Sequence, residues 1–209
     1  MKVEKRLALL AGTAMLAASG SAEAHIVAAR LGDFYAGALH PLTDLQDTVL
    51  WLALGLFAAS IGPERARWLV LIMPLGLLAG FSMELAFGVG SVGTLGNAAM
   101  MVCVGLLLAA RIRANTTTLC AIALFLALTR GAVNADGIVA ETNRALFAAG
   151  LATAGYTAIT LVMALTVAFR RTAGGGPGNW QDIAIRVCGS WIAAIGLMIG
   201  GFALKYGAA

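Results

Sequence analysis

The sequence predicts an all-α membrane protein, a bundle of six transmembrane helices that follows a cleavable signal peptide. Three observations indicate this fold class. Hydrophobic residues make up 60% of the 209-residue chain and charged residues only 11%, whereas a soluble domain is about 25% charged. The apolar residues fall into six long runs separated by charges, glycine or proline. A seventh, shorter apolar run at the start of the chain has the form of a targeting signal.

The amino-terminal segment contains the three parts of a secretory signal peptide. Basic residues lie within 2–6, an apolar stretch covers 7–18, and an A-x-A cleavage motif occupies 22–24. We therefore expect 1–24 to be a signal peptide and 25–209 to be a single transmembrane domain. The alternative is an uncleaved first helix. Cleavage would place the new amino terminus outside the cytoplasm.

Six apolar runs follow, each long enough to be considered as a span of a hydrocarbon core about 30 Å thick. The predicted spans are 45–62, 68–87, 93–110, 116–133, 145–169 and 183–204. Each run is followed by a breaker or a charge, such as Gly62-Pro63 after the first. Asn115 or Thr116 is the expected amino-terminal cap of the fourth helix.

The distribution of arginines gives an orientation. With the mature amino terminus outside, the predicted inner loops carry Arg65, Arg67, Arg111, Arg113, Arg170 and Arg171, and the outer loops carry only Arg144. This imbalance satisfies the positive-inside rule. It predicts a bacterial inner (cytoplasmic) membrane protein with both mature termini in the periplasm.

Most acidic residues fall at the predicted outer side. They are Asp33, Asp44, Asp47, Asp136 and Glu141, whereas Glu64 and Asp182 fall at the inner side. Acidic residues contribute little to orientation, so the orientation alone does not account for this bias. An acidic mouth on one side of the membrane would attract cations.

Three ionisable residues precede the first span, in the stretch GALHPLTDLQD. His40, Asp44 and Asp47 have helical spacing, and Pro41 predicts a break at His40 with the spanning helix starting at Pro41. An imidazole and two carboxylates on one face can bind a divalent cation, and ionisable residues at membrane depth mark ion paths. Alternatively, both aspartates cap the helix and face interfacial water.

A second polar cluster lies in TRGAVNADGIVAETNR, residues 129–144. Asn134, Asp136 and Glu141 offer oxygen ligands on the same predicted side of the membrane. The alternative is an ordinary outer loop with Asp-Gly turn chemistry. Nearby, Glu84 and Arg130 could pair across helices. The alternative is that the Arg130 side chain snorkels to the interface.

Several motifs resemble those of the HupE/UreJ family, membrane proteins associated with hydrogenase and urease gene clusters. AGALHPLTDLQD before an apolar span resembles the start of these proteins, and GLLLAARIR resembles the end of their third span. RVCGSWIAAIGLMIGG in the last span has Arg186, Gly189 and Gly196 in the family's Arg-Gly-Gly pattern. The resemblance implies a membrane bundle that acts as a nickel or cobalt permease through histidine-rich motifs.

The chain departs from that pattern at the metal-binding positions. Gln46-Asp47 stands where the family has an aspartate-histidine pair, and Asn134 and Asp136 stand nearest its second histidine motif. Only His40 carries over as a functional residue of the family. Oxygen in place of nitrogen favours manganese, iron(II), cobalt or magnesium over nickel.

The sequence therefore predicts a divalent metal ion permease that takes up its ion from the periplasmic side. The candidate ligands are His40, Asp44, Asp47, Asn134, Asp136 and Glu141, with the imidazole and free amine of His25 as a further candidate. The alternative is a non-transporting scaffold or assembly partner that retains the fold.

Other functions and partners follow from the same residues. We expect no resident cofactor beyond a transported nickel, cobalt, manganese or iron ion. We expect no enzyme activity, because H-E-x-x-H and G-x-S-x-G motifs are absent from the sequence. The expected partners are the lipid bilayer, the ion, and either a second copy of the chain or a metalloenzyme-maturation protein, but no nucleic acid.

Overall fold

The computed structural model describes residues 31–90, 92–136, 138–171 and 180–207. Within these ranges every regular element is an α-helix, as the sequence predicts. The helices are α3 (Asp33–Thr43), α4 (Leu45–Ile61), α5 (Pro63–Ala66), α6 (Leu69–Phe87), α7 (Gly93–Ala109), α8 (Thr116–Ala135), α9 (Arg144–Arg171) and α10 (Trp180–Tyr206). The predicted signal peptide, 1–24, lies outside the described residues.

Each predicted span coincides with one of the longer helices, α4 and α6 to α10, with ends that agree to within three residues. Four segments are long and apolar enough to cross a membrane: Pro63–Phe87, Thr116–Ala135, Arg144–Arg171 and Trp180–Tyr206. The pair α3 and α4 qualifies as a fifth when counted together, while α7 is a shorter apolar helix. The structure thus supports four to five spans, and the count of six stays a prediction.

The break in the first span lies at Asp44 and not at His40, so the predicted position of the break is wrong. Helix α3 continues through Pro41 to Thr43, and α4 leaves it at an angle of 79°. Two hydroxyls fix the bend: Thr43 Oγ1 donates to the carbonyl of His40 at 2.7 Å, and Thr48 Oγ1 donates to that of Pro41 at 3.0 Å. Pro41 is tolerated because it removes only one backbone donor from a short helix.

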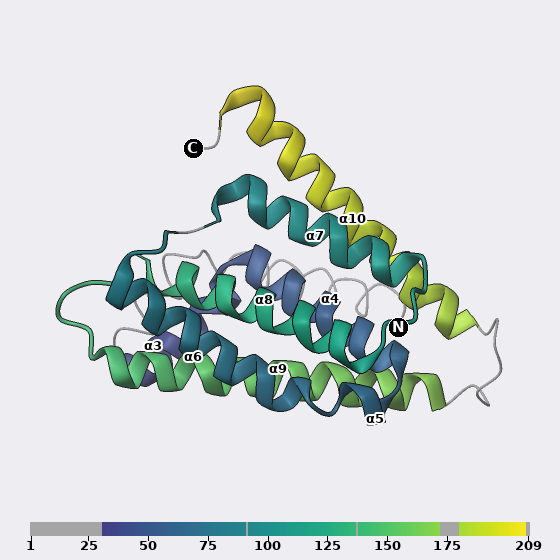
Figure 1. Ribbon diagram of the computed structural model, residues 1–209, viewed down its shortest axis with the longest axis horizontal. Helices are drawn as coiled ribbons and strands as arrows, with labels where there is room; N and C mark the ends of the chain where they lie inside the picture. The colour runs from purple at the N-terminus through teal and green to yellow at the C-terminus, as the bar shows by residue number, and fades with distance from the viewer. Residues whose placement is uncertain (1–30, 91, 137, 172–179, 208–209) are drawn as a thin grey trace, which may run out of the picture.

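Helices α4, α9, α6 and α8 pack around one another, and α7 and α10 form a pair on the side of α4 (Figure 1). Helix α3 lies across α9. The carboxyl-terminal part of α10 diverges from the bundle in the same view (Figure 1). Helix α4 is therefore central, and residues at its amino end can meet α7 and α8.

Three helix pairs depend on glycines at their crossing points. A Cβ added to Gly150 of α9 would lie 1.9 Å from the carbonyl oxygen of Phe34 in α3, and one added to Gly80 of α6 would lie 2.0 Å from that of Leu128 in α8. Between α7 and α10, a Cβ on Gly189 would lie 2.7 Å from the amide nitrogen of Ala109. Close backbone approach of this kind is typical of small residues in membrane helix pairs.

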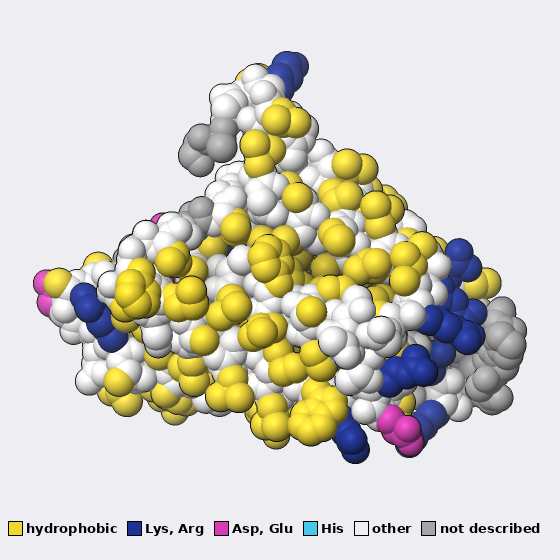
Figure 2. All heavy atoms as spheres, in the orientation of Figure 1, with side chains coloured by type: hydrophobic (Ala, Val, Ile, Leu, Met, Phe, Trp, Pro, Cys, Tyr) yellow, Lys and Arg dark blue, Asp and Glu magenta, His cyan; other side chains and the backbone are white. Residues whose placement is uncertain are grey.

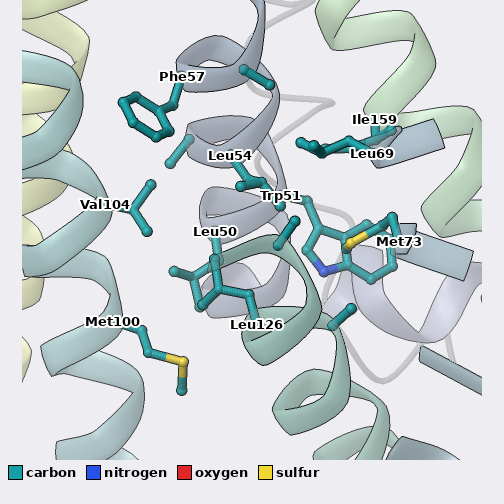
Figure 3. Close-up of a cluster of buried hydrophobic side chains, with 14 of the residues drawn as sticks. Leu50, Trp51, Leu54, Phe57, Leu69, Met73, Met100, Val104, Leu126 and Ile159 are labelled. Atoms are coloured by element: carbon teal, nitrogen blue, oxygen red, sulfur yellow. The ribbon is translucent and has the colours of Figure 1, made fainter. Parts of the chain in front are cut away.

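The interior of the bundle is filled by large apolar side chains from α4 and its neighbours (Figure 3). Leu50, Leu54 and Phe57 of α4 are almost completely buried and pack against residues of α6, α7, α8 and α9. This core lies along α4 beyond its polar amino end, so it closes the interior next to the charged residues described below.

The outer surface is largely apolar and its basic residues gather at one end (Figure 2). Many leucines and phenylalanines on α6, α9 and α10 are exposed, among them Leu75, Leu165 and Phe202. Figure 2 shows most of the dark blue side chains at the end that contains α5, and magenta side chains at both ends. An apolar belt between two polar ends is the surface expected of a membrane protein.

Candidate functional site

Arg130 of α8 is fully buried and forms the centre of an ionic cluster. Its relative exposure is 0%, and its guanidinium makes three hydrogen bonds to side chains. Nε donates to Oδ1 of Asp47, Nη2 donates to Oδ2 of Asp44 at 2.8 Å, and Nη1 donates to Oδ1 of Asn97 at 2.8 Å. The cluster therefore joins α8 to α7 and to the start of α4.

Asn134 completes the cluster one helical turn after Arg130. Its Nδ2 donates to Oδ2 of Asp47 at 2.7 Å and to the backbone carbonyl of Arg130 at 2.8 Å. Because the amide group donates in both bonds, its orientation is fixed by the surroundings. Asp47 thus receives one hydrogen bond on each carboxylate oxygen from α8.

Local sequence explains why the two aspartates point inward. Asp44 has extended backbone geometry and caps α4, since its Oδ1 accepts the backbone N–H of Gln46 at 2.8 Å. Asp47 lies in the first turn of α4, where a carboxylate is also favoured by the helix dipole. The bend at Asp44 directs both side chains toward α8.

The two aspartates of the cluster differ in their exposure to solvent. The Asp44 side chain is 38% exposed, whereas that of Asp47 is 1% exposed. Two carboxylates and one guanidinium leave a formal charge of −1. A cation approaching this end would therefore meet Asp44 first and Asp47 behind it.

Among the described residues, one buried atom of the cluster and one on the next turn of α4 have no hydrogen-bond partner. One is Oδ1 of Asn134, an amide oxygen whose residue is 1% exposed. The other is Nε1 of Trp51, which lies one helical turn along α4 from Asp47. Buried polar atoms are rarely left unpaired. The Asn134 oxygen is a donor atom that a cation next to Asp47 could use.

The structure brings together three of the residues predicted to bind a metal, namely Asp44, Asp47 and Asn134. Asp136 and Glu141 are exposed, and the ring of His40 packs edge-on against Phe147 of α9 at 5.6 Å. His25 lies outside the described residues.

Two members of the cluster were not expected from the sequence. Arg130 neither snorkels nor pairs with Glu84, so both expectations for it are wrong. Glu84 instead accepts the backbone N–H of Gly90 at 2.9 Å. Asn97 was missed altogether, although it is buried in the first turns of α7. A charge balance would have pointed to Arg130, because buried carboxylates require a cation and Arg130 precedes Asn134 by one helical turn.

The cluster is not a preformed metal site. In the part of the chain that the structure describes, no group of three or more His, Cys, Asp or Glu side chains is arranged to hold a metal ion. The oxygens of Asp44, Asp47 and Asn97 point instead at the guanidinium of Arg130. They are hard donors of the kind that bind manganese or magnesium.

The fold and the cluster define a multi-pass helical membrane protein with a buried ionic centre at a broken helix. The HupE / UreJ family model matches residues 13–199. The chain belongs to the HupE/UreJ family, a transporter-type membrane family related to nickel and cobalt transport. No curated protein and no solved structure matches the chain in the corresponding comparisons.

The Arg-Gly-Gly residues of the last span have structural roles in this chain. Arg186 Nε donates to the carbonyl of Ala109 at the end of α7, at 2.9 Å. Gly189 and Gly196 lie where the backbone of α7 comes close to α10, so that an added Cβ would meet Ala109 N at 2.7 Å or Ala98 O at 2.9 Å. These three residues therefore hold α10 against α7 and lie outside the ionic cluster.

Proposed function

We propose that the protein transports a divalent metal ion across the membrane, with the Arg130 cluster as its ion-binding site. The carboxylates of Asp44 and Asp47 and the amide oxygens of Asn97 and Asn134 are the ligands in this proposal. Asp44 and Asp47 lie at the break between α3 and α4, and Asn97 of α7 and Asn134 of α8 join them through Arg130 and Asp47. Discontinuous helices with polar groups at the break are the usual construction of transporter binding sites.

The unpartnered Oδ1 of Asn134 is the observation that carries the proposal. It belongs to the amide group whose Nδ2 donates to Asp47, and it is closed to water, so leaving it unsatisfied costs on the order of 1–3 kcal/mol. A purely structural ion pair would have no use for an unpartnered oxygen at this position. A site that receives a cation would use the oxygen as a ligand.

Arg130 acts as a tethered cation in this mechanism. When no ion is bound, the guanidinium keeps Asp47 neutralised and holds the ligands together. A divalent ion that enters past Asp44 displaces the guanidinium and leaves the two carboxylates and the ion with no net charge. Charge neutralisation of this kind offsets part of the ion's dehydration cost. The oxygen-rich set favours manganese, iron(II) or cobalt over nickel.

The test is uptake of Mn²⁺, Co²⁺ and Ni²⁺ into liposomes that contain the full-length protein. Asp47→Asn keeps the shape of the side chain and removes its charge, so uptake should fall at least about tenfold, the effect of losing roughly 1.4 kcal/mol of ion binding. Asp136→Asn removes one carboxylate from an exposed position and should change uptake less than about threefold. Equal effects of the two substitutions would contradict the assignment of the site.

A second candidate function is a scaffold that no longer transports. The observation in its favour is that Arg130 already uses Nε, Nη1 and Nη2 to satisfy three side chains, as a structural lock between helices would. This candidate expects no uptake by the unmodified protein. It also expects Asp47→Asn to lower stability without any transport to lose.

A further inference from the structure

Two hollows adjoin each other at the end of the molecule opposite the ionic cluster. One is a pocket of about 450 Å³ lined by Arg65, Arg111, Arg113 and Arg170, which we call the arginine pocket. The other is an apolar groove of about 610 Å³ along α9, which we call the α9 groove. Pro63 lies in the wall of both. A charged hollow therefore continues into an apolar one.

The arginine pocket has more positive charge than its acids neutralise. Asp182 pairs with Arg111 at 2.9 Å and with Arg170 at 3.1 Å, which fixes these two guanidinium groups. Arg65 and Arg113 form no ion pair with any residue that the structure describes. Glu64 is the one acid among the lining residues. The pocket thus combines two fixed arginines with two whose donors are available to an anion.

Arg111 occupies a backbone position that normally favours glycine. Its φ is 54°, and it follows α7 in a Schellman turn, in which Arg111 N–H bonds Leu108 O at 3.1 Å and Ile112 N–H bonds Leu107 O at 3.1 Å. A left-handed conformation is unfavourable for a residue with a Cβ, and such residues concentrate at functional sites. The arginine side chain is therefore retained here against the preference of the backbone.

The α9 groove has the dimensions of one membrane leaflet. Its walls include Thr160, Ala164, Ala168 and Arg171 on successive turns of α9, with Val70 of α6. From 160 to 171 a helix rises about 16 Å, which is roughly half of the 30 Å hydrocarbon core. The groove is lined almost entirely by apolar side chains and ends at an arginine.

We propose that the arginine pocket and the α9 groove together bind one anionic phospholipid. The phosphate and the charged headgroup lie among Arg65, Arg111 and Arg113, and one acyl chain follows α9 along the groove. Guanidinium groups bind phosphate oxygens through paired, charge-assisted hydrogen bonds. Basic pockets at the ends of membrane helices are suited to anionic headgroups. The charge and the apolar groove together favour a lipid over a free anion.

The experiment uses the purified full-length protein in a neutral detergent. Thermal unfolding is followed while dioctanoyl phosphatidylglycerol, dioctanoyl phosphatidylcholine or inorganic phosphate is titrated. We expect saturable stabilisation by phosphatidylglycerol and little by the other two, because ligand binding to the folded state raises the melting temperature. Equal stabilisation by inorganic phosphate would replace the lipid by a free anion and overturn the proposal, as would equal stabilisation by phosphatidylcholine.

Substitutions locate the headgroup. Arg65→Gln with Arg113→Gln removes the two arginines that have no ion pair in the described chain, so the fold should persist and the affinity for phosphatidylglycerol should fall at least about tenfold. Arg67→Gln removes one positive charge at a neighbouring residue that does not line the pocket, and should leave the affinity within about twofold. Equal affinities of the two proteins would overturn the headgroup assignment.

A second pair of substitutions tests the acyl chain. Ala164 lines the groove and is exposed, so Ala164→Trp should fill the groove and weaken phosphatidylglycerol binding without changing any charge. Leu165 is 59% exposed on the same helix and does not line the groove, so Leu165→Trp is the matched control. Binding that survives Ala164→Trp unchanged would show that the groove holds no chain.

Discussion

Arg130 carries a positive charge in a fully buried position, and three side chains around its guanidinium offset the cost of burying that charge. Asp44, Asp47 and Asn97 each accept one of its hydrogen bonds. Buried ion pairs add little net stability when both partners are present, but they are costly to break from one side. Removing Arg130 alone should therefore be much more costly than removing the whole ionic group.

Replacing Arg130 alone should destabilise the protein strongly. Arg130→Met leaves the Asp47 carboxylate buried without its cation, so we expect the free energy of unfolding to fall by about 3–5 kcal/mol. Reversible unfolding in mixed detergent micelles would measure this loss. Arg144→Gln, which removes an arginine from an exposed helix start, should stay within about 0.5 kcal/mol of the unmodified protein.

Removing the acids together with Arg130 should restore much of that stability. Arg130→Met combined with Asp47→Leu and Asp44→Asn replaces the ion pair by apolar packing and keeps the cap of α4. If the combined variant is as unstable as Arg130→Met alone, the hydrogen bonds of the cluster, and not charge compensation, are its main contribution to the stability of the protein.

The sequence predicted part of this cluster and missed the rest for a physical reason. Asp44, Asp47 and Asn134 were recognisable as oxygen donors at one end of the bundle, because the span pattern places them on one side. The sequence did not reveal that Arg130 points inward, since an arginine near a helix end can reach either the interface or the interior. The packing of α4 against α8 determines whether the Arg130 side chain reaches the interface or the interior.

At the scale of single helices, the break between α3 and α4 determines where the cluster forms. Pro41 suggested a break one turn too early, because a proline can be accommodated inside a short helix when hydroxyls bond the carbonyls around it. Asp44 ends α3 because its side chain caps the following helix. Cap geometry, rather than the proline, set this boundary.

The capping and charge roles of Asp44 can be separated. Asp44→Asn keeps a side-chain oxygen that accepts the Gln46 N–H, whereas Asp44→Ala does not, and both lose the charge beside Arg130. We expect Asp44→Ala to be less stable than Asp44→Asn by about 1 kcal/mol. Equilibrium unfolding of the two variants measures the difference, and identical stabilities would argue against the cap.

Glycines at the helix crossings should be sensitive to a single methyl group. Gly150→Ala would place a Cβ 1.9 Å from the carbonyl oxygen of Phe34, so α3 must move away from α9 at a cost of about 1–3 kcal/mol. Gly201 of α10 has open space around the same position, and Gly201→Ala should be neutral or stabilising by up to about 1 kcal/mol. Melting temperatures of the two variants give the comparison.

At the scale of the whole molecule, the charges separate into two ends. The arginines of the predicted inner loops gather around Asp182 and the arginine pocket, and the Asp44 cluster lies at the other end of α4. The sequence predicted this separation, because the positive-inside rule depends on composition alone. It did not predict the divergence of α10 or the close pair that α10 makes with α7, since these depend on tertiary packing.

The orientation of the molecule can be read by chemical labelling. In a cysteine-free protein, a single cysteine that replaces Arg113 and one that replaces Glu141 should differ in their labelling. The experiment uses cells whose outer membrane has been removed and whose inner membrane is intact. The positive-inside distribution predicts that an impermeant maleimide labels position 141 and not position 113. The reverse pattern would place the ionic cluster at the cytoplasmic side and require uptake to be reconsidered as export.

The central claim is that a divalent ion takes the place of the Arg130 guanidinium between Asp44 and Asp47. A structure of the protein determined with saturating Mn²⁺, using anomalous scattering to locate the ion, tests it most directly. The account predicts a peak about 2.0–2.6 Å from oxygens of both aspartates, with the guanidinium displaced. Mn²⁺ bound only at exposed acids such as Glu141, with Arg130 still bonded to Asp47, would contradict it.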